Sequence, residues 1–505
     1  MTFAITYSRA QIGIEAPLIT VEADISQGLP QIQIVGMPAT TVKEAKDRVK
    51  SAITNAGLKT PSRRVTINLA PADLPKQGGR YDLAIAVSIL AANGDLPQDA
   101  LQQCEWLGEL ALDGQLRAVN GVLPAAIQCA AANRLLIVPT LNGAEANLAG
   151  PANVRVANNL LEVIAHLKGV TTLPRPDSIA TPNRSPEYGG IADVRGQLVA
   201  KRGLVIAAAG SHNLMFIGPP GTGKTMLANR LRSLLPPLST PEALEVAAVH
   251  SVSNYTFDPL TWGQRPFRSP HHTTSSIALV GGSSPPRPGE ISLAHHGILF
   301  LDELPEFSRR VLEVLREPLE SGHIMISRAQ YQVCYPARFQ LIAAMNACPC
   351  GYYGDVRQPC HCSQERIAAY RNRVSGPLLD RIDLHVSVPS LARGLLSDPD
   401  YSPDIMAHEA ATAQVLSARK LMFERAAKPN AHLSSAEVSR DCKLSEADGK
   451  LMDSAMEKLG LSARGYFKVL KIARTIADMA GAADLTTPHL TEALAFRQLD
   501  RSRTI

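Results

Sequence analysis

The chain has 505 residues, of which 45% are apolar and 19% are charged, and this balance is typical of globular proteins with several hydrophobic cores. No apolar run reaches the roughly 20 residues that cross a bilayer, and the N-terminus lacks the basic and apolar segments of a signal peptide, so we expect no membrane span and a cytoplasmic location. The net charge of +5 permits contact with nucleic acid on a local surface but does not require it.

The first predicted domain, residues 1–171, alternates short strands with helices. After a strand at the N-terminus, short β-like runs predict the strands Leu18–Ala23, Ile32–Val35, Val65–Leu69 and Leu135–Val138. Apolar residues at helical spacing predict the helices Thr41–Ala56, Asp82–Ala92 and Val122–Ala131. The alternation predicts an α/β domain.

A stretch rich in proline, serine and glycine, residues 172–190, has no periodic apolar pattern and is predicted to be a linker. The second domain, residues 191–395, is predicted to be an α/β domain with a parallel sheet. Its predicted elements are the helix Val194–Ala209, the strand Leu214–Ile217, the helix Lys224–Leu235 and the strands Ile298–Leu301 and Phe339–Met345. The third domain, residues 396–505, is predicted to be helical, with helices Ala407–Ala427, Ser445–Lys458, Ala463–Met479 and Pro488–Phe496.

A glycine-rich loop of the form G-x-x-x-x-G-K-T lies between the strand Leu214–Ile217 and the helix that follows it. The residues of this loop are Gly218, Pro219, Pro220, Gly221, Thr222, Gly223, Lys224 and Thr225. Glycines let backbone N–H groups close around phosphate oxygens, and the helix N-terminus adds a favourable dipole. We expect Lys224 to reach the β- and γ-phosphates of ATP and Thr225 to ligate Mg²⁺.

Polar residues follow the next two predicted strands. Asp302 and Glu303 follow the strand Ile298–Leu301, whose continuous apolar residues predict a strand buried on both faces. Ligands bind at the carboxyl ends of such strands. We expect Asp302 beside the magnesium and Glu303 beside the attacking water, although an acidic helix cap is the alternative. Asn346, after the third strand, could hold that water or sense the γ-phosphate, or could be an ordinary turn residue.

Phosphoryl transfer needs cations around the γ-phosphate. Two arginines are candidates for this role. Arg381 lies in Ser375–Asp383, and Arg464 lies at the start of a helix in the third domain. From the residues alone, either could be a surface arginine or part of an ordinary ion pair.

Four of the eight cysteines cluster as two C-x-C pairs. They are Cys348, Cys350, Cys360 and Cys362. Four thiolates on one short loop can bind Zn²⁺ tetrahedrally, and a cytosolic cysteine cluster suggests metal more than disulfides. The spacing is tighter than the usual C-x₂-C, so four reduced thiols remain the alternative, and His361 could replace one ligand.

Two basic segments are candidates for binding DNA. One is the insert Phe267–Arg287, and the other is a predicted hairpin, residues 322–338, with Arg328 at its tip. The candidate residues are Arg268, His271, His272, Arg287 and Arg328. Phosphate contacts carry no sequence information, so such binding would be sensitive to salt and tolerant of sequence. A solvated loop and a hairpin that only packs on a neighbouring subunit are the alternatives.

The order of strands and loops resembles that of AAA+ ATPases. The segments Pro266–His272 and Gly281–Gly297, between the glycine loop and Asp302, resemble the magnesium-chelatase-like branch. Within it, nearly the whole chain is similar to the bacterial ComM/YifB family, including Gly196–Arg202 and Ser462–Gly481.

This resemblance implies a homohexameric ring with a C-terminal helical lid domain. It assigns Glu303 as the catalytic glutamate, Asn346 as sensor 1, Arg381 as an arginine finger given to a neighbouring subunit, and Arg464 as sensor 2. It also implies an N-terminal domain with the Lon-protease fold. Arg80 and Leu123 stand where the Ser–Lys dyad of that fold would be, so we expect no peptidase activity.

The resemblance implies an ATP-dependent helicase that promotes branch migration of recombination intermediates in natural transformation. Single-stranded and branched DNA are then the expected substrates, with recombinase machinery as a candidate partner. The alternative is a chelatase-like or remodelling motor that acts on a protein partner.

Overall fold

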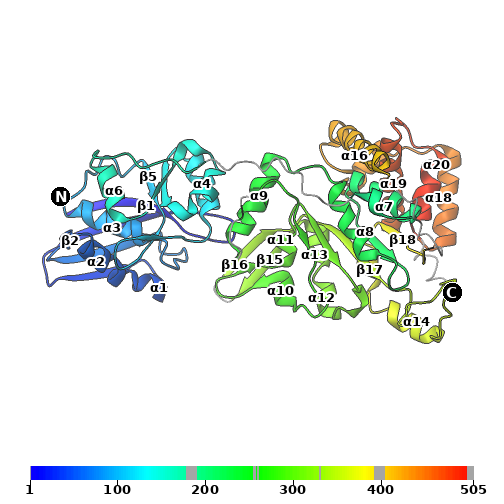
Figure 1. Cartoon of the computed structure of the whole chain (residues 1–505), viewed down its shortest axis with the longest axis horizontal. Coiled ribbons are helices and arrows are strands. Elements are labelled where there is room, and N and C mark those ends of the chain that lie inside the picture. The colour runs from blue at the N-terminus through cyan, green and yellow to red at the C-terminus, as the bar shows by residue number, and fades with distance from the viewer. Residues whose placement is uncertain are drawn as a thin grey trace.

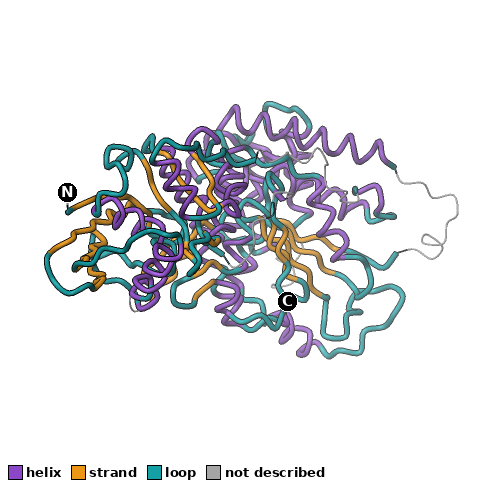
Figure 2. The backbone as a smooth tube through the Cα atoms, turned by 60° about the vertical axis from the view of Figure 1, so that its left-hand side comes forward, coloured by secondary structure: helices purple, strands orange, loops and turns teal. Residues whose placement is uncertain are grey.

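The computed structural model describes residues 2–177, 190–253, 258, 261–328, 331–391 and 404–497. Figure 1 shows three bodies in a row, with the N-terminal α/β domain at one end, a second α/β domain in the middle and a helical domain beside the second. Figure 2 shows the strands gathered in two groups, one in each α/β domain, with helices around them. None of the described helices combines the length and the apolar character needed to cross a bilayer.

The N-terminal domain is built on a seven-stranded mixed sheet with the strand order β3-β4-β2-β1-β5-β8-β9. Alternate residues of β1, β2 and β4 are buried, because one face of the sheet packs against helices. The strands are β1 Phe3–Arg9, β2 Leu18–Ser26, β3 Gln31–Val35, β4 Arg64–Ala70, β5 Cys104–Trp106, β8 Leu135–Pro139 and β9 Val154–Ala157, with the short pair β6 Glu109–Leu110 and β7 Leu116–Arg117. The helices are α1 Thr40–Lys43, α2 Ala45–Asn55, α3 Asp82–Ala92, α4 Val122–Ala131, α5 Gly143–Asn147 and α6 Leu160–Leu167.

The predicted elements of this domain are largely confirmed. Helices α3 and α4 have the predicted bounds, and α3 is buried along its whole length. The predicted helix Thr41–Ala56 is instead two helices that meet at Glu44. Ser88 lies inside α3, is buried, and donates a hydrogen bond to the carbonyl of Ile85, so it is a packing residue.

The central domain carries a five-stranded parallel sheet with the order β11-β14-β17-β10-β18. Every residue of β14 and β17 is buried, as a strand covered on both faces requires. The strands are β10 Leu214–Ile217, β11 Phe267–Arg268, β14 Ile298–Leu301, β17 Gln340–Met345 and β18 Leu384–Ser387. The helices are α7 Leu198–Gly210, α8 Lys224–Arg230, α9 Thr240–Ser251, α10 Ser276–Val280, α11 Glu290–Leu293, α12 Arg309–Glu313, α13 Arg316–Ser321, α14 Gln364–Arg371 and α15 Gly376–Leu379.

Two predicted helices of this domain have different bounds in the structure. The helix predicted from Val194 begins at Leu198, because Gln197 adopts a left-handed conformation with φ of +50° and interrupts the helical path before it. The helix from Lys224 ends at Arg230 and continues as the 3₁₀ turn Leu231–Ser233.

The central domain also contains two hairpins. The predicted hairpin of residues 322–338 is confirmed as β15 His323–Arg328 paired antiparallel with β16 Tyr331–Pro336, and the turn residues 329–330 lie outside the described residues. A shorter hairpin joins β12 Gly281–Gly282 to β13 Arg287–Pro288.

The C-terminal domain is helical, as predicted. Its helices are α16 Ile405–Ala426, α17 Ser435–Asp441, α18 Glu446–Leu459, α19 Ala463–Met479 and α20 Thr487–Ala495. Buried side chains of α16 and α19 share one hydrophobic core with α7 and β10 of the central domain. The predicted boundary at residue 396 lies outside the described residues.

The N-terminal domain contacts the central domain through the end of α9. The backbone N–H of Gly121 donates to the carbonyl of Ser251 at 2.9 Å, and the N–H of Leu123 donates to the Ser251 hydroxyl at 3.4 Å. Leu173, inside the predicted linker, is buried against the N-terminal domain, and residues 178–189 of that linker lie outside the described residues.

Candidate active site

The glycine-rich loop connects the end of β10 to the start of α8. Gly221 and Gly223 have φ of +75° and +85°, a left-handed conformation that favours glycine. The loop therefore turns sharply enough to aim backbone N–H groups inward, in front of the N-terminus of α8. Lys224 lies on this first turn, and its Nζ donates to the carbonyls of Gly218 and Pro219 at 2.9 and 2.8 Å.

The parallel sheet brings the polar residues after three strands to one edge. Lys224 Nζ, after β10, lies 3.1 Å from Oδ1 of Asn346, which follows β17. The hydroxyl of Thr225 donates a 2.6 Å hydrogen bond to Oδ2 of Asp302, which follows β14. Lys224 and Thr225 of the phosphate loop therefore each contact a residue at the end of another strand, far away in the sequence.

The oxygen atoms of Thr225 and Asp302 fit a magnesium site. Mg²⁺ prefers oxygen ligands and is usually held by one or two protein groups together with phosphate and water. A hydroxyl and a carboxylate oxygen 2.6 Å apart, beside a phosphate loop, supply such a pair. Burial lowers the pKa of Lys224, and the carboxylates of Asp302 and Glu303 partly oppose that shift.

Glu303 stands next to this group on a tight turn. Its φ is +52°, and its N–H donates to Oδ1 of Asp302 at 2.9 Å. Its side chain is 56% exposed, and Oε2 lies 3.3 Å from Nδ1 of His272. A carboxylate at this position can accept a proton from a water, and His272 competes for the same lone pairs.

The insert before β14 thus brings its histidines to the candidate catalytic carboxylate. The rings of His271 and His272 lie against each other, with centroids 4.1 Å apart and planes inclined by 34°, and His272 meets the ring of Phe307 edge-on. Sequence reasoning assigned His272 to DNA and missed its contact with Glu303, because the pairing depends on how the insert folds back over the sheet edge.

Arg381 and Arg464 come together on another part of the surface. Arg381 follows α15, and its Nη2 lies 2.5 Å from Oε1 of Glu320. Nη2 of Arg464, at the start of α19, lies 3.5 Å from the same carboxylate oxygen. Arg381 also donates to the carbonyl of Pro377. Sequence reasoning missed Glu320, which joins the two arginines across the central and C-terminal domains.

The structure brings the Sγ atoms of the four clustered cysteines close together. The Sγ atoms of Cys348, Cys350 and Cys360 are separated by 3.3 to 3.6 Å, and the four Sγ atoms all lie within 4.8 Å of one another. Zn–S bonds of roughly 2.3 Å give S···S edges of about 3.8 Å in a tetrahedron, so the cluster fits zinc. His361 is exposed and is not one of the grouped ligand atoms.

The cysteine loop packs directly on the phosphate loop. Gly351 has φ of +91°, and a Cβ atom at this position would lie 2.6 Å from Cδ of Pro220. Only glycine permits this close approach. The geometry of the cysteine cluster is thus linked to the loop that would hold phosphate.

A second group of potential ligand atoms, from Glu245, His295 and His296, does not fit a metal. Oε2 of Glu245 lies 2.9 Å from Nε2 of each histidine. Nδ1 of His295 accepts the backbone N–H of Arg338 at 3.0 Å, so the proton of the neutral ring is on Nε2, which donates to Glu245 and has no lone pair for a metal. The two histidines lower the pKa of Glu245 to about 2 and tie α9 to the entry of β14.

The remaining DNA candidates do not form one basic surface. Arg268 makes a bidentate ion pair with Glu290, at 2.6 and 2.8 Å, which neutralises its charge. Arg287 faces the N-terminal domain, where it lines a cavity. Arg328 is exposed at the end of β15, next to the turn of the hairpin.

The positions that correspond to a Ser–Lys dyad hold Arg80 and Leu123, and both side chains are buried. Lys76, the nearest lysine in the sequence, is also buried, and its Nζ donates to the carbonyls of Gly36 and Pro71. An amine held by two carbonyls is not available as a general base for a neighbouring hydroxyl.

Comparison with known protein families agrees with this architecture. The family of the magnesium chelatase subunit ChlI matches residues 190–396, the family described as subunit ChlI of Mg-chelatase matches residues 21–142, and the ChlI C-terminal family matches residues 407–497. Together these matches include all three domains.

Curated relatives match the whole length. The chain is 49% identical to the competence protein ComM of Haemophilus influenzae, over 99% of this chain and 98% of that protein. It is 48% identical to YifB of Escherichia coli over the same shares. A magnesium-chelatase 67 kDa subunit of Heliobacterium mobile is 27% identical over 43% of this chain and 33% of its own length. The chain therefore belongs to the ComM/YifB family of magnesium-chelatase-like AAA+ proteins.

Proposed function

We propose that the chain is a cytoplasmic ATPase whose hydrolysis drives movement along DNA. The observation that carries this proposal is the contact group of Lys224, Asn346, Thr225 and Asp302 at the carboxyl edge of the parallel sheet. Lys224 binds the β- and γ-phosphates, and the backbone N–H groups of Gly221, Thr222 and Gly223 cradle them. Thr225 and Asp302 would hold Mg²⁺, which neutralises charge on the phosphates.

Glu303 is proposed to orient and deprotonate the attacking water, with Asn346 holding the water or the γ-phosphate. Glu303 is adjacent to Asp302, so the proposed general base and the proposed magnesium ligand lie on one short turn. Its partly exposed carboxylate can reach a water outside the phosphate loop.

The active unit is proposed to be a homohexameric ring. Arg381 and Arg464 share Glu320, and within the described part of the chain the polar partners of their side chains are Glu320 and a backbone carbonyl, not the residues around Lys224. Two arginines grouped in this way can be offered to the nucleotide of a neighbouring copy, where they would stabilise charge on the transferred phosphoryl group.

The proposed substrate is single-stranded or branched DNA, and the proposed process is branch migration of recombination intermediates in natural transformation, with recombinase machinery as a partner. Support comes from a relative named competence protein, 49% identical over nearly all of both chains. The hairpin of β15 and β16, with exposed Arg328 at its end, offers a cation for backbone phosphates.

We further propose that Cys348, Cys350, Cys360 and Cys362 hold a structural zinc ion. Four sulfur ligands leave no open position, so the metal would brace the loop without taking part in hydrolysis. Because Gly351 packs on Pro220, a rigid cysteine loop would also hold the phosphate loop in position.

The test is ATP turnover by the full chain with no DNA and with single-stranded, duplex and branched DNA, together with a strand-exchange assay on a branched substrate. We expect branched DNA to stimulate turnover and the branch point to move only with ATP. Lys224→Ala is the control for both signals. Absence of stimulation by any DNA would contradict the DNA motor.

A motor that acts on a protein partner is the second candidate. The observation in its favour is the match of three segments to families of the magnesium chelatase subunit ChlI. If this candidate is correct, the ATPase site is intact but DNA changes neither turnover nor assembly.

A further inference from the structure

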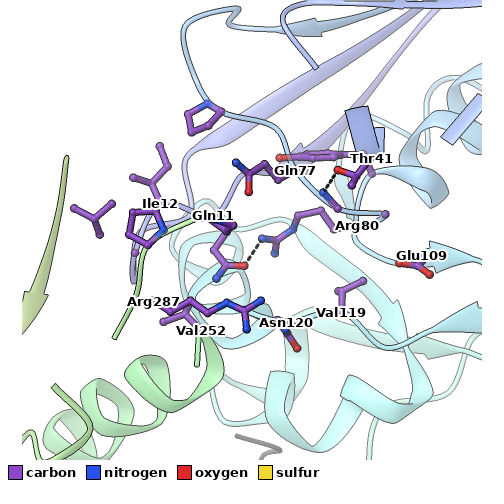
Figure 3. Close-up of a pocket in the computed structure, with 18 of the residues that line it drawn as sticks. Gln11, Ile12, Thr41, Gln77, Arg80, Glu109, Val119, Asn120, Val252 and Arg287 are labelled. Atoms are coloured by element: carbon purple, nitrogen blue, oxygen red, sulfur yellow. Dashed lines mark hydrogen bonds between the residues drawn. The ribbon is translucent and has the colours of Figure 1, made fainter. Parts of the chain in front are cut away.

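A cavity of about 400 Å³ lies between the N-terminal domain and the central domain. Figure 3 shows its lining, to which Gln11, Arg80 and Asn120 contribute from the N-terminal domain and Val252 and Arg287 from the central domain. Ligand pockets in proteins have volumes of roughly 300–1,000 Å³, so the cavity can hold a small molecule. No part of it belongs to the candidate ATP site.

Arg80 is a buried cation that forms no ion pair with any described residue, although its charge interacts with that of the buried carboxylate Glu145. It is only 5% exposed, its Nη1 donates to Oε1 of Gln11 at 3.2 Å, and its Nη2 donates to the carbonyl of Gly121 at 3.2 Å. Its Nε has no hydrogen-bond partner, and Arg80 makes no ion pair within the described part of the chain. Buried charges are normally paired, because an unpaired one loses its hydration without compensation.

A second guanidinium enters the cavity from the opposite wall. The side chain of Arg287, on β13 of the central domain, forms no hydrogen bond or ion pair with any described residue. Figure 3 shows Arg80 and Arg287 reaching into the cavity from the two domains. Among the described residues that line the cavity, Glu109 is the only carboxylate, and it lies 3.8 Å from Nη1 of Arg117. The cavity therefore has an excess of positive charge.

The rest of the lining is neutral and mixed. The amides of Gln11, Gln77 and Asn120 can donate and accept hydrogen bonds, while Ile12 and Val333 are apolar. Inorganic phosphate alone would leave the apolar wall and part of the volume unused. A ligand with an anionic group and an organic body matches both parts of the lining.

We propose that this cavity binds a small organic phosphate of the nucleoside monophosphate class, with its phosphate between Arg80 and Arg287. Two guanidinium groups from opposite walls can bind different oxygens of a tetrahedral phosphate, whereas one guanidinium fork already satisfies a planar carboxylate. The amide side chains and the apolar wall then surround the nucleoside. Because each domain supplies one arginine, the ligand stabilises the contact between the domains.

The test is isothermal titration of the full-length Lys224→Ala variant with adenosine 5′-monophosphate, which separates this site from the ATP site. Inorganic phosphate, adenosine and benzoate are titrated in parallel. We expect saturable binding of the monophosphate, weaker binding of phosphate, and no binding of adenosine or benzoate. Binding of benzoate as tightly as the monophosphate, or no binding of any phosphate, overturns the proposal.

The arginines are then changed one at a time in the same background. Loss of a hydrogen bond to a charged group costs roughly 1.5–3 kcal/mol, so Arg80→Gln and Arg287→Gln should each weaken monophosphate binding by about tenfold or more. The control variants are Arg64→Gln on β4 and Arg310→Gln on α12, which are exposed and away from the cavity. Arg287 is only partly buried, so its variant tests the site even if Arg80→Gln does not fold. Unchanged binding in Arg287→Gln overturns the proposal.

Discussion

His272 holds the carboxylate of Glu303, with Nδ1 of the histidine 3.3 Å from Oε2 of the glutamate. Both side chains are partly exposed, 33% and 56%, so the pair is a weak one. While it is formed, one oxygen of Glu303 is not available to a water. Exposed ion pairs contribute roughly 0.2–1 kcal/mol, so we expect His272→Ala to raise ATP turnover without DNA by a factor of about 1.4–5.

The measurement is steady-state ATP turnover of the assembled protein without DNA. His271→Ala is the matched control, because it removes the ring next to His272 and leaves the contact of His272 with Glu303 in place. A large fall in turnover of His272→Ala would mean that His272 positions Glu303 for the reaction instead of restraining it.

Glu303→Gln is expected to separate ATP binding from hydrolysis. The amide has the shape of the carboxylate but cannot accept a proton, and a positioned general base contributes roughly 10²–10⁴ in rate. The variant should therefore bind ATP and assemble like the original protein while turnover falls by about that factor. Glu306→Gln, on the turn that follows, is the control and should hydrolyse normally. Equal turnover of Glu303→Gln and the unchanged chain would exclude Glu303 as the base.

Lys224→Ala is expected to abolish nucleotide binding. The cationic Nζ of Lys224 contacts two carbonyls of the phosphate loop and the side chain of Asn346. Without this cation, the negative charge of the bound phosphates is not compensated. Binding of a fluorescent ATP analogue with Mg²⁺ measures the effect. Lys420→Ala, an exposed lysine on α16, should bind the analogue normally. Retained affinity in Lys224→Ala would refute the assignment of the loop.

Arg381→Ala is expected to lower turnover of the ring by about 10³ or more, the range of arginine fingers. The decisive measurement mixes Arg381→Ala chains with Lys224→Ala chains. If Arg381 acts on the nucleotide of a neighbouring copy, an interface between an intact phosphate loop and an intact arginine forms only in the mixture, and part of the activity returns. Arg316→Ala, which pairs locally with Glu313, is the control. If Arg381→Ala alone, or an unassembled subunit, hydrolyses ATP at the full rate, the ATP site is not shared between neighbouring copies.

The sequence predicts the helices and strands of this chain well where the apolar residues form a clear pattern. The bounds of α3, α4, α19, β10 and β14 are those expected, because each has a strong periodic or continuous apolar pattern. Helix α17 was missed because its seven residues contribute only one buried side chain, Val438, to the core. Gln197 shortened α7 through a left-handed backbone angle that residue type does not reveal.

In the candidate site, too, the contacts that follow from local sequence could be predicted, and those that depend on the packing of domains could not. The contacts of Lys224 with Asn346 and of Thr225 with Asp302 follow from parallel strands, whose carboxyl ends meet at one edge. The bridge from Glu320 to two arginines follows no such rule, because it depends on how the helical domain packs against the central domain. The cavity around Arg80 is likewise set by the packing of two domains.

Removal of zinc is expected to weaken the phosphate loop as well as the cysteine loop. We expect one zinc ion per chain by metal analysis of protein purified without chelators, and none in Cys348→Ser or Cys360→Ser. Because Gly351 packs on Pro220, these variants should unfold at a lower temperature and bind ATP more weakly. Cys334→Ser, an exposed cysteine on β16 outside the cluster, is the matched control and should keep its zinc, stability and ATP affinity. Metal-free protein with unchanged ATP affinity would show that the four thiols are reduced side chains and that the loop needs no metal to support Pro220.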